Sequence, residues 1–142
     1  MDTQSKNIVF YPENYLCRGR NFYTHEWVYG HYVPSVVDGY EESFLVKRDG
    51  SFLWCRVISD TINRWTGYVK NGKKVWENDR IKDHFGEEIG TIRYGVYHNP
   101  FDAQSAIHVG FYVDWGENDL LRKDLGYWID ILSDEDNVIP SD

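Results

Sequence analysis

The sequence is poor in the residues that catalysis and metal binding most often require. Only two cysteines, Cys17 and Cys55, occur among the 142 residues, and they form no CxxC pair. Two isolated thiols without a secretory leader are typical of a reduced, cytosolic protein. The five histidines show neither HxH nor HExxH spacing, so we predict no metal site. No cofactor is expected either.

The chain also lacks the patterns that place a protein in a membrane, in the secretory pathway or in a common enzyme class. Its apolar runs are all shorter than the roughly eighteen residues that a membrane-spanning helix needs. The opening MDTQSKNIVF has no cationic region followed by an apolar one, so it is no signal peptide. GxSxG, GxGxxG and GxxxxGK[ST] are all absent. We therefore expect a cytoplasmic protein that does not span a membrane, with no catalytic residues and no enzymatic activity.

Negative charge is concentrated in the last third of the chain. The formal net charge is −8 overall, and it is −2 over residues 1–60, +2 over residues 61–97 and −8 over residues 98–142. A surface for double-stranded nucleic acid needs clustered Lys and Arg, so such a ligand is not expected. The acidic end is either a solvated tail or a contact for the basic middle of a second subunit. A further interpretation is that it mimics nucleic acid.

Aromatic side chains, which favour sheets and interfaces, make up 17% of the chain. Asp49-Gly50 lies between two alternating apolar runs, and Asp-Gly favours a two-residue type I′ hairpin turn. Because such a turn pairs Lys47 with Phe52, the predicted core face holds Phe44, Val46, Leu53 and Cys55. The other face holds Leu45, Phe52 and Trp54 and is also apolar. A sheet with two apolar faces needs a covering layer or a neighbouring subunit.

Another hairpin, a strand and one helix are predicted further along the chain. Asn71-Gly72 repeats the hairpin signal, and residues 107–115 alternate as a half-buried strand does. From residue 121 to residue 132, apolar residues recur at three- and four-residue steps. This period predicts a C-terminal helix capped by Asn118 or Asp119.

The predicted fold is mainly β, with small SH3-like or barrel-like modules, several hairpins and one C-terminal helix. One module covers residues 1–60. The other covers residues 61–142 and includes the acidic helix and tail, and the two modules either pack separately or share one core.

Basic and aromatic side chains are interleaved on both sides of the Asn71-Gly72 turn. Cations hold phosphates and aromatic rings stack on bases, so this cluster is the candidate surface for an anionic ligand or an acidic partner protein. The alternative is a solvated hairpin edge, where Lys prevents edge-to-edge aggregation. The candidate residues are Trp65, Tyr68, Lys70, Lys73, Lys74, Trp76, Arg80 and Lys82.

Two segments resemble one known family, in that family's own order. Residues 18–33, RGRNFYTHEWVYGHYV, resemble the pattern FRGKxxxxGEWVxGxx, and residues 65–82, WTGYVKNGKKVWENDRIK, resemble YTGLKDKNGKxIxEGDIVK. Together they are similar to the YopX family of small phage- and prophage-encoded proteins. Asn78 stands where that family usually has Gly, and the ending DILSDEDNVIPSD does not carry the family's C-terminal pattern. The resemblance implies a β-dominated, multimeric protein without established catalytic residues.

The motif positions of residues 65–82 also have an explanation in turn geometry. Asn71-Gly72 supplies positive φ angles, and residues Glu77 to Asp79 can satisfy backbone donors at a tight turn.

The leading hypothesis is a non-enzymatic phage or prophage accessory protein in the bacterial cytoplasm, which acts by binding and inhibits a host or defence factor. The resemblance, the lack of a catalytic set and the many aromatic side chains support it. One alternative is a homo-oligomer that sequesters a small nucleotide-like or other anionic ligand. Another is an acidic mimic of nucleic acid.

Overall fold

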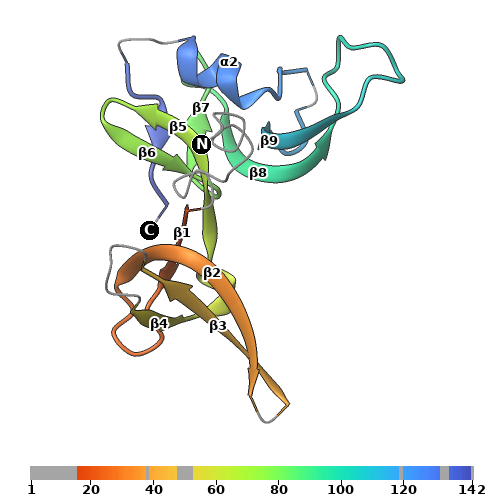
Figure 1. Ribbon diagram of the computed structural model, residues 1–142. Coiled ribbons are helices and arrows are strands. Elements are labelled where there is room, and N and C mark those ends of the chain that lie inside the picture. Colours follow the sequence, from red (N-terminus) through yellow and green to blue (C-terminus); the bar gives the residue numbers. More distant parts are fainter. Residues whose placement is uncertain (1–15, 38, 48–52, 119, 132–134, 142) are drawn as a thin grey trace, which may run out of the picture. The chain divides into compact units, whose positions relative to one another are not determined.

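In the part of the chain that the structure describes, ten antiparallel strands and one short α-helix make up most of the regular structure. The computed structural model describes residues 16–37, 39–47, 53–118, 120–131 and 135–141 (Figure 1). The two sheets contain six and four strands, which confirms the predicted mainly β fold with hairpins and one C-terminal helix. The chain divides into two compact units, Met1–Trp65 and Thr66–Asp142, so the division lies inside the strand that follows residue 62.

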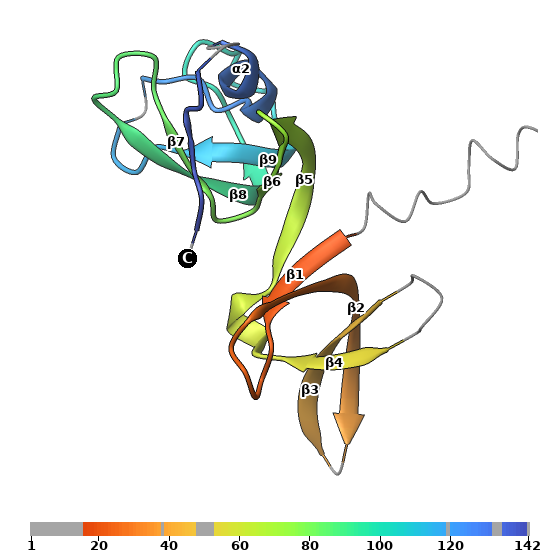
Figure 2. The ribbon, with the colours of Figure 1, turned by 90° about the vertical axis from the view of Figure 1, so that its left-hand side faces the viewer.

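The first unit is an antiparallel meander whose sheet curls (Figure 2). Strand β1 pairs with β2, β2 with β3 and β3 with β4, and β1 also pairs with the start of β5. Its core cluster consists of the buried Cys17, Leu45 and Val57, with Val28 and Ile62 packed against them. The bounds are β1 Leu16–Arg20, β2 Trp27–Val37, β3 Tyr40–Val46, β4 Trp54–Val57, the 3-10 helix η2 Ser59–Thr61 and β5 Asn63–Lys70.

The pairing of β3 with β4 differs by one residue from the predicted hairpin. Leu45 lies opposite Cys55 rather than opposite Trp54, and a slip of one residue turns every side chain to the other face. Leu45 is therefore fully buried in the core, while Phe44 packs edge-on against Trp54 on the opposite face. The predicted core face is therefore wrong for Phe44 and for Leu53, which is 56% exposed, although Val46 is buried. The Asp49-Gly50 turn itself lies outside the described residues.

The second unit combines a hairpin, a four-stranded sheet and the helix. At the β5–β6 turn the φ angles of Asn71 and Gly72 are 51° and 78°, which confirms the positive-φ turn predicted there. Strands β10, β7, β8 and β9 form the second sheet in that order. The bounds are β6 Lys73–Trp76, β7 Arg80–Lys82, β8 Ile89–Tyr97, β9 His108–Asp114, helix α2 Leu125–Asp130 and β10 Val138–Ile139.

The core of the second unit lies between α2 and one face of the four-stranded sheet (Figure 2). A Cβ atom at Gly90 would lie 2.4 Å from Cγ1 of Val113, so glycine is what allows this side chain to pack so closely on β8. The buried members of the core are Val75, Ile81, Ile92, Val113, Trp115, Leu125, Trp128 and Ile129.

Two tryptophans fix the segment that precedes α2. The indole N–H groups of Trp115 and Trp128 both donate to the backbone carbonyl of Arg122, at 2.8 and 2.6 Å, and their rings meet edge to face with centroids 4.8 Å apart. The helix is shorter than the apolar period predicts. It begins at Leu125, so Leu121 precedes it, and neither Asn118 nor the undescribed Asp119 is its N-cap, which is Asp124.

Asp79, one of the two acidic residues after β6, satisfies backbone donors at a turn, as the sequence predicts. Asp79 is only 2% exposed, and its carboxylate accepts hydrogen bonds from the backbone N–H of Trp76 at 2.8 Å and of Ser141 at 2.9 Å. Asn78 has a φ of 74°, a conformation that Asn tolerates better than most residues. Asp79 thus ties the C-terminal segment to a turn far from it in sequence.

Candidate functional site

The eight side chains predicted as a binding surface do not gather on one face. Lys70 and Trp76 are each 5% exposed, and the ammonium of Lys70 donates to the carbonyl of Ile129 at 2.5 Å. Because that carbonyl belongs to the last turn of α2, Lys70 supplies the positive charge that a helix C-terminus favours. The structure thus gives Lys70 a role inside the fold.

The other predicted residues lie on β5, beside the β5–β6 turn and on β7. Trp65 is the last residue of the first unit and is half-buried. Tyr68 is partly exposed, and its hydroxyl is 2.7 Å from the position that a Cβ on Gly126 would take. The rest are exposed, with Lys73 and Lys74 beside the β5–β6 turn, and Arg80 and Lys82 on β7.

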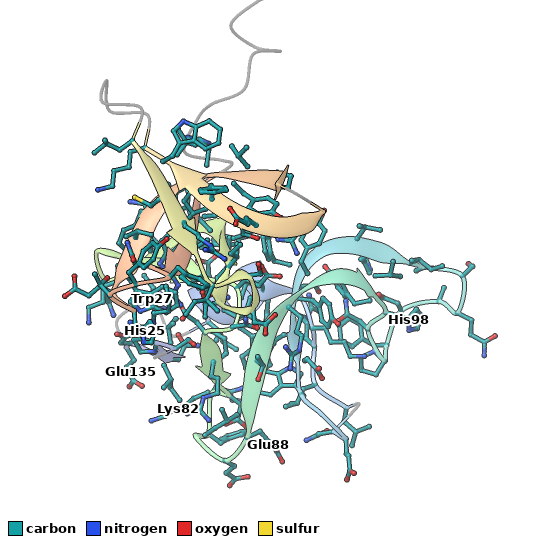
Figure 3. All side chains as sticks on the ribbon, turned by 90° about the horizontal axis from the view of Figure 1, so that it is seen from below. His25, Trp27, Lys82, Glu88, His98 and Glu135 are labelled. Atoms are coloured by element: carbon teal, nitrogen blue, oxygen red, sulfur yellow. The ribbon has the colours of Figure 1, made fainter. Side chains whose placement is uncertain are left out.

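Arg80 and Lys82 lie on the face of the four-stranded sheet that points away from its core (Lys82 is labelled in Figure 3). We call this the outer face, because its side chains alternate along each strand with core residues such as Ile81 and Ile92. It carries Arg80, Lys82, Thr91, Arg93, Tyr97, His108, Tyr112 and Asp114. Arg93, which sequence reasoning missed, therefore joins two of the predicted cations.

Arg93 is held at the centre of the outer face by two neighbours. Its Nε lies 3.5 Å from Oδ2 of Asp114, and its Nη1 donates to Oδ1 of Asn78 at 3.4 Å. The side chain of Arg93 is still 51% exposed, so it remains accessible to a further acceptor.

Three rings stack beside these cations. The centroids of Tyr97 and Tyr112 are 5.2 Å apart with 23° between the planes, and those of Tyr97 and His108 are 5.0 Å apart with 21° between the planes. We call this set the ring row. Gly95 pairs with Gly110 in the rung between, and Cε1 of Tyr112 lies 3.9 Å from where a Cβ on Gly95 would be. Because glycine has no side chain, the rings can lie directly against the backbone at this rung.

Asp124 anchors the ring row to the start of α2. The hydroxyl of Tyr97 donates to its Oδ1 at 2.8 Å, the amide of Asn99 donates to its Oδ2 at 2.9 Å, and Nη1 of Arg122 is 3.6 Å away. Burial first, and then the hydrogen bond to Asp124, raise the pKa of Tyr97 to about 12. Tyr97 is therefore a neutral hydrogen-bond donor at physiological pH and not a base.

Asp102 orders the loop between β8 and β9. It accepts from Nε2 of His108 at 2.8 Å and from the backbone N–H of Asn99 at 3.3 Å. The hydrogen bond from His108 is the main reason that the pKa of Asp102 lies below its usual value. Asn99 is itself 1% exposed and accepts from the backbone N–H of Lys123 at 2.6 Å. These contacts hold one loop against the ring row.

A second candidate surface lies on the face of β8 and β9 that contributes to the core. It occupies the part of this face that extends past the buried core residues. Ile92 and Val113 are fully buried, but further along the same face Tyr94, Val96, Ile107 and Val109 are 45–69% exposed. We call these four residues the apolar end. The alternation predicted for residues 107–115 is therefore correct as strand geometry, although its first apolar residues meet solvent rather than the core.

The apolar end adjoins an open strand edge. Strand β9 is the last strand of its sheet. The backbone N–H of Val113 donates to the carbonyl of Lys123 at 2.8 Å, and Tyr112 bridges to Asp124, so the C-terminal half of this edge is covered. Among the described residues, no strand pairs with residues 108–110 on the edge that points away from β8.

The first unit uses its own basic and aromatic side chains within the fold. The guanidinium carbons of Arg18 and Arg20 lie 4.3 and 4.0 Å from the ring centroid of Trp27 (labelled in Figure 3). Arg18 is only 5% exposed, and its Nε donates to the side chain of Asn63 at 3.1 Å. Sequence reasoning did not single out this cluster.

Comparison with known protein families, with curated proteins and with solved structures finds no match to this chain. Over the described residues, no group of three or more His, Cys, Asp or Glu side chains is arranged to hold a metal ion. Within the same residues, no helix has the length and apolar character needed to cross a bilayer.

Proposed function

We propose that the chain is a non-enzymatic binding protein that takes up an extended segment of a partner protein at the outer edge of β9. The observation that carries this proposal is the open edge at residues 108–110 beside the exposed Val96, Ile107 and Val109. An incoming strand gains main-chain hydrogen bonds from such an edge and specificity from side chains on alternate positions.

The apolar end supplies a driving force for this binding. Burying one Val or Ile side chain contributes about 1.5–3 kcal/mol. Val96 of β8 lies opposite Val109 of β9, and Ile107 stands two residues before Val109. Large exposed apolar patches on small proteins often mark interaction sites. The partner segment that fits best is an extended one with apolar residues at every second position.

The resemblance to the YopX family adds a biological setting to the proposal. In that setting the chain is a phage or prophage accessory protein, it works in the cytoplasm of a bacterial host, and its partner is a host or defence factor. A homo-oligomer is the related alternative, in which the incoming strand comes from a second copy.

A proline at position 109 tests the strand edge directly. The N–H of Val113 points to the outer edge, and alternate residues of an antiparallel strand point the same way, so the N–H of Val109 points there too. Val109→Pro removes that donor without removing a hydrogen bond of the sheet. We expect the variant to fold and to lose the partner that the wild type retains from host lysate at one-to-one stoichiometry.

Val69→Asp is the matched control, because Val69 is also exposed, at 53%, but lies on β5. It should retain the partner. Native mass spectrometry of the purified chain distinguishes a host protein from a second copy. Equal recovery of the partner by wild type and Val109→Pro would refute the strand-edge proposal.

A further inference from the structure

We propose that the outer face of the β10–β7–β8–β9 sheet binds a nucleotidyl group, that is, an aromatic base with its phosphate. The observation is that the ring row of Tyr112, Tyr97 and His108 shares this face with Arg80, Lys82 and Arg93. This site differs from the edge of β9 in its residues and in its ligand. The group can belong to a single strand of nucleic acid or to a free nucleotide, and the experiment below separates these sources.

The ring row offers the stacking surface. Bases stack on aromatic side chains regardless of sequence, since every base has a π face. Tyr97 and Tyr112 are both partly exposed. The Tyr112 ring lies above the Gly95–Gly110 rung and stacks on Tyr97, so a base would stack on the ring face of Tyr112 that is turned away from Tyr97.

The cations lie where the phosphate of a stacked base would reach. Arg93 is directly opposite Tyr112 in the β8–β9 register, and directly opposite side chains are about 4.5–5.5 Å apart at Cβ. Arg80 lies one rung away, opposite Thr91, and Lys82 lies opposite Ile89. A base on Tyr112 therefore places its phosphate beside Arg93, with Arg80 and Lys82 available to the next phosphate of a chain.

The carboxylate of Asp114 opposes phosphate binding, so removing its charge should increase the affinity. Oδ2 of Asp114 lies 3.5 Å from Nε of Arg93, so Asp114 competes with an incoming phosphate for the guanidinium and also repels it. Its other oxygen accepts from the backbone N–H of Gly116 at 2.9 Å, and Asn in its place can still accept that bond. Asp114→Asn should therefore strengthen binding.

The charge of the chain limits the ligand to a few phosphates. The formal net charge is −8 and the outer face carries only three cations among its described residues, so this face offers no extended basic surface for a duplex. A short single strand or a nucleotide needs only local cations together with stacking.

The experiment is a fluorescence anisotropy titration with a labelled oligothymidylate of about ten nucleotides, with unlabelled thymidine triphosphate as competitor. In about 50 mM salt, wild type should bind the oligonucleotide and lose affinity as salt rises. If the triphosphate displaces it at comparable concentrations, the source is a free nucleotide. If only excess unlabelled oligonucleotide displaces the labelled probe, the ligand is a single strand of nucleic acid.

The variants assign the binding to the outer face. Combined Arg80→Ala and Lys82→Ala should weaken binding roughly tenfold and reduce the steepness of the salt dependence by about 0.7 for each lost phosphate contact. Tyr112→Ala should weaken binding roughly tenfold with an unchanged salt slope, and Tyr112→Phe should bind like wild type. Asp114→Asn should bind a few-fold more tightly.

Combined Lys73→Ala and Lys74→Ala is the matched control. It removes the same charge from the same unit at the β5–β6 turn, away from the outer face, and should leave affinity within about twofold. No binding of either probe in low salt overturns the proposal. It is also overturned if the Lys73 and Lys74 control loses as much affinity as the Arg80 and Lys82 variant. The same holds if Asp114→Asn does not increase the affinity.

Discussion

A buried arginine in the first unit contrasts with two exposed cations in the second. In the first unit, Arg18 is buried, lies over Trp27 and donates to Asn63. In the second, Arg80 and Lys82 stand exposed on a sheet face. All three cations have aromatic residues nearby in the sequence, so the local composition does not show which of them is buried. The difference shows that a cation near a tryptophan can serve the fold, and that its hydrogen bonds and exposure decide whether it can serve a ligand.

The largest expected effect tests that contrast directly. Arg18→Ala removes a charge-assisted hydrogen bond and leaves the side chain of Asn63 without this partner, so it should lower the free energy of unfolding by about 2–4 kcal/mol. Arg80→Ala should change it by no more than about 0.5 kcal/mol. Chemical denaturation followed by circular dichroism measures both. Similar midpoints for the two variants would remove the distinction between the units.

Lys70 sharpens the comparison, because it is a cation of the second unit that serves the fold. Lys70→Ala leaves the carbonyl of Ile129 without its ammonium partner, and we expect a loss of about 1.5–3 kcal/mol in the free energy of unfolding. Lys73→Ala, on the same hairpin but exposed, is the control and should lie within about 0.5 kcal/mol of wild type. Equal denaturation midpoints for the two variants would contradict the role assigned to Lys70.

Titration of Tyr97 tests the anchor of the ring row. Its folded pKa is raised to about 12, above the value of about 10 in an unfolded chain. Its contribution to stability is therefore complete below pH of about 10 and is lost as the pH rises towards 12. Asp124→Asn should lower the pKa of Tyr97, because it removes the charge and weakens the acceptor. Ultraviolet difference titration of tyrosinate, with Tyr97→Phe to assign the signal, measures the shift; an unchanged pKa would contradict the role of Asp124.

The smallest effect is expected at the apolar end. Val96 is already 66% exposed, so Val96→Ser should change the free energy of unfolding by no more than about 0.5 kcal/mol. The same change at the fully buried Val113 should cost several times more, because it leaves a cavity and buries a hydroxyl. Thermal melts of the pair give the comparison. A large loss at Val96 would mean that the apolar end is part of the core.

Local signals were the part of the fold that the sequence could predict. Asn71-Gly72 forms its turn because two neighbouring residues suffice for a positive-φ pair. The β3–β4 register could not be predicted in the same way. Both faces of that hairpin are apolar, so the period that normally fixes register carries no information there.

The candidate site was only partly predictable for a related reason. Arg80 and Lys82 were found from the sequence, and the alternation of Arg93 and Tyr97 along β8 is visible there too. The burial of Lys70 was not predictable, since its acceptor, Ile129, lies 59 residues further along the chain. Likewise, Asp124 holds Tyr97 across 27 residues. Contacts over such separations follow from packing, which a local pattern does not encode.

The contact between Trp115 and Trp128 provides a spectroscopic signal of the tertiary structure of the second unit. Two indoles with centroids 4.8 Å apart at 64° are close enough for their electronic transitions to couple, and coupled transitions give a paired circular dichroism signal that separate indoles lack. Trp115 directly follows β9, and Trp128 belongs to α2. The signal therefore registers the docking of the helix on the sheet, and a chain that keeps its strands but releases the helix would lose it first.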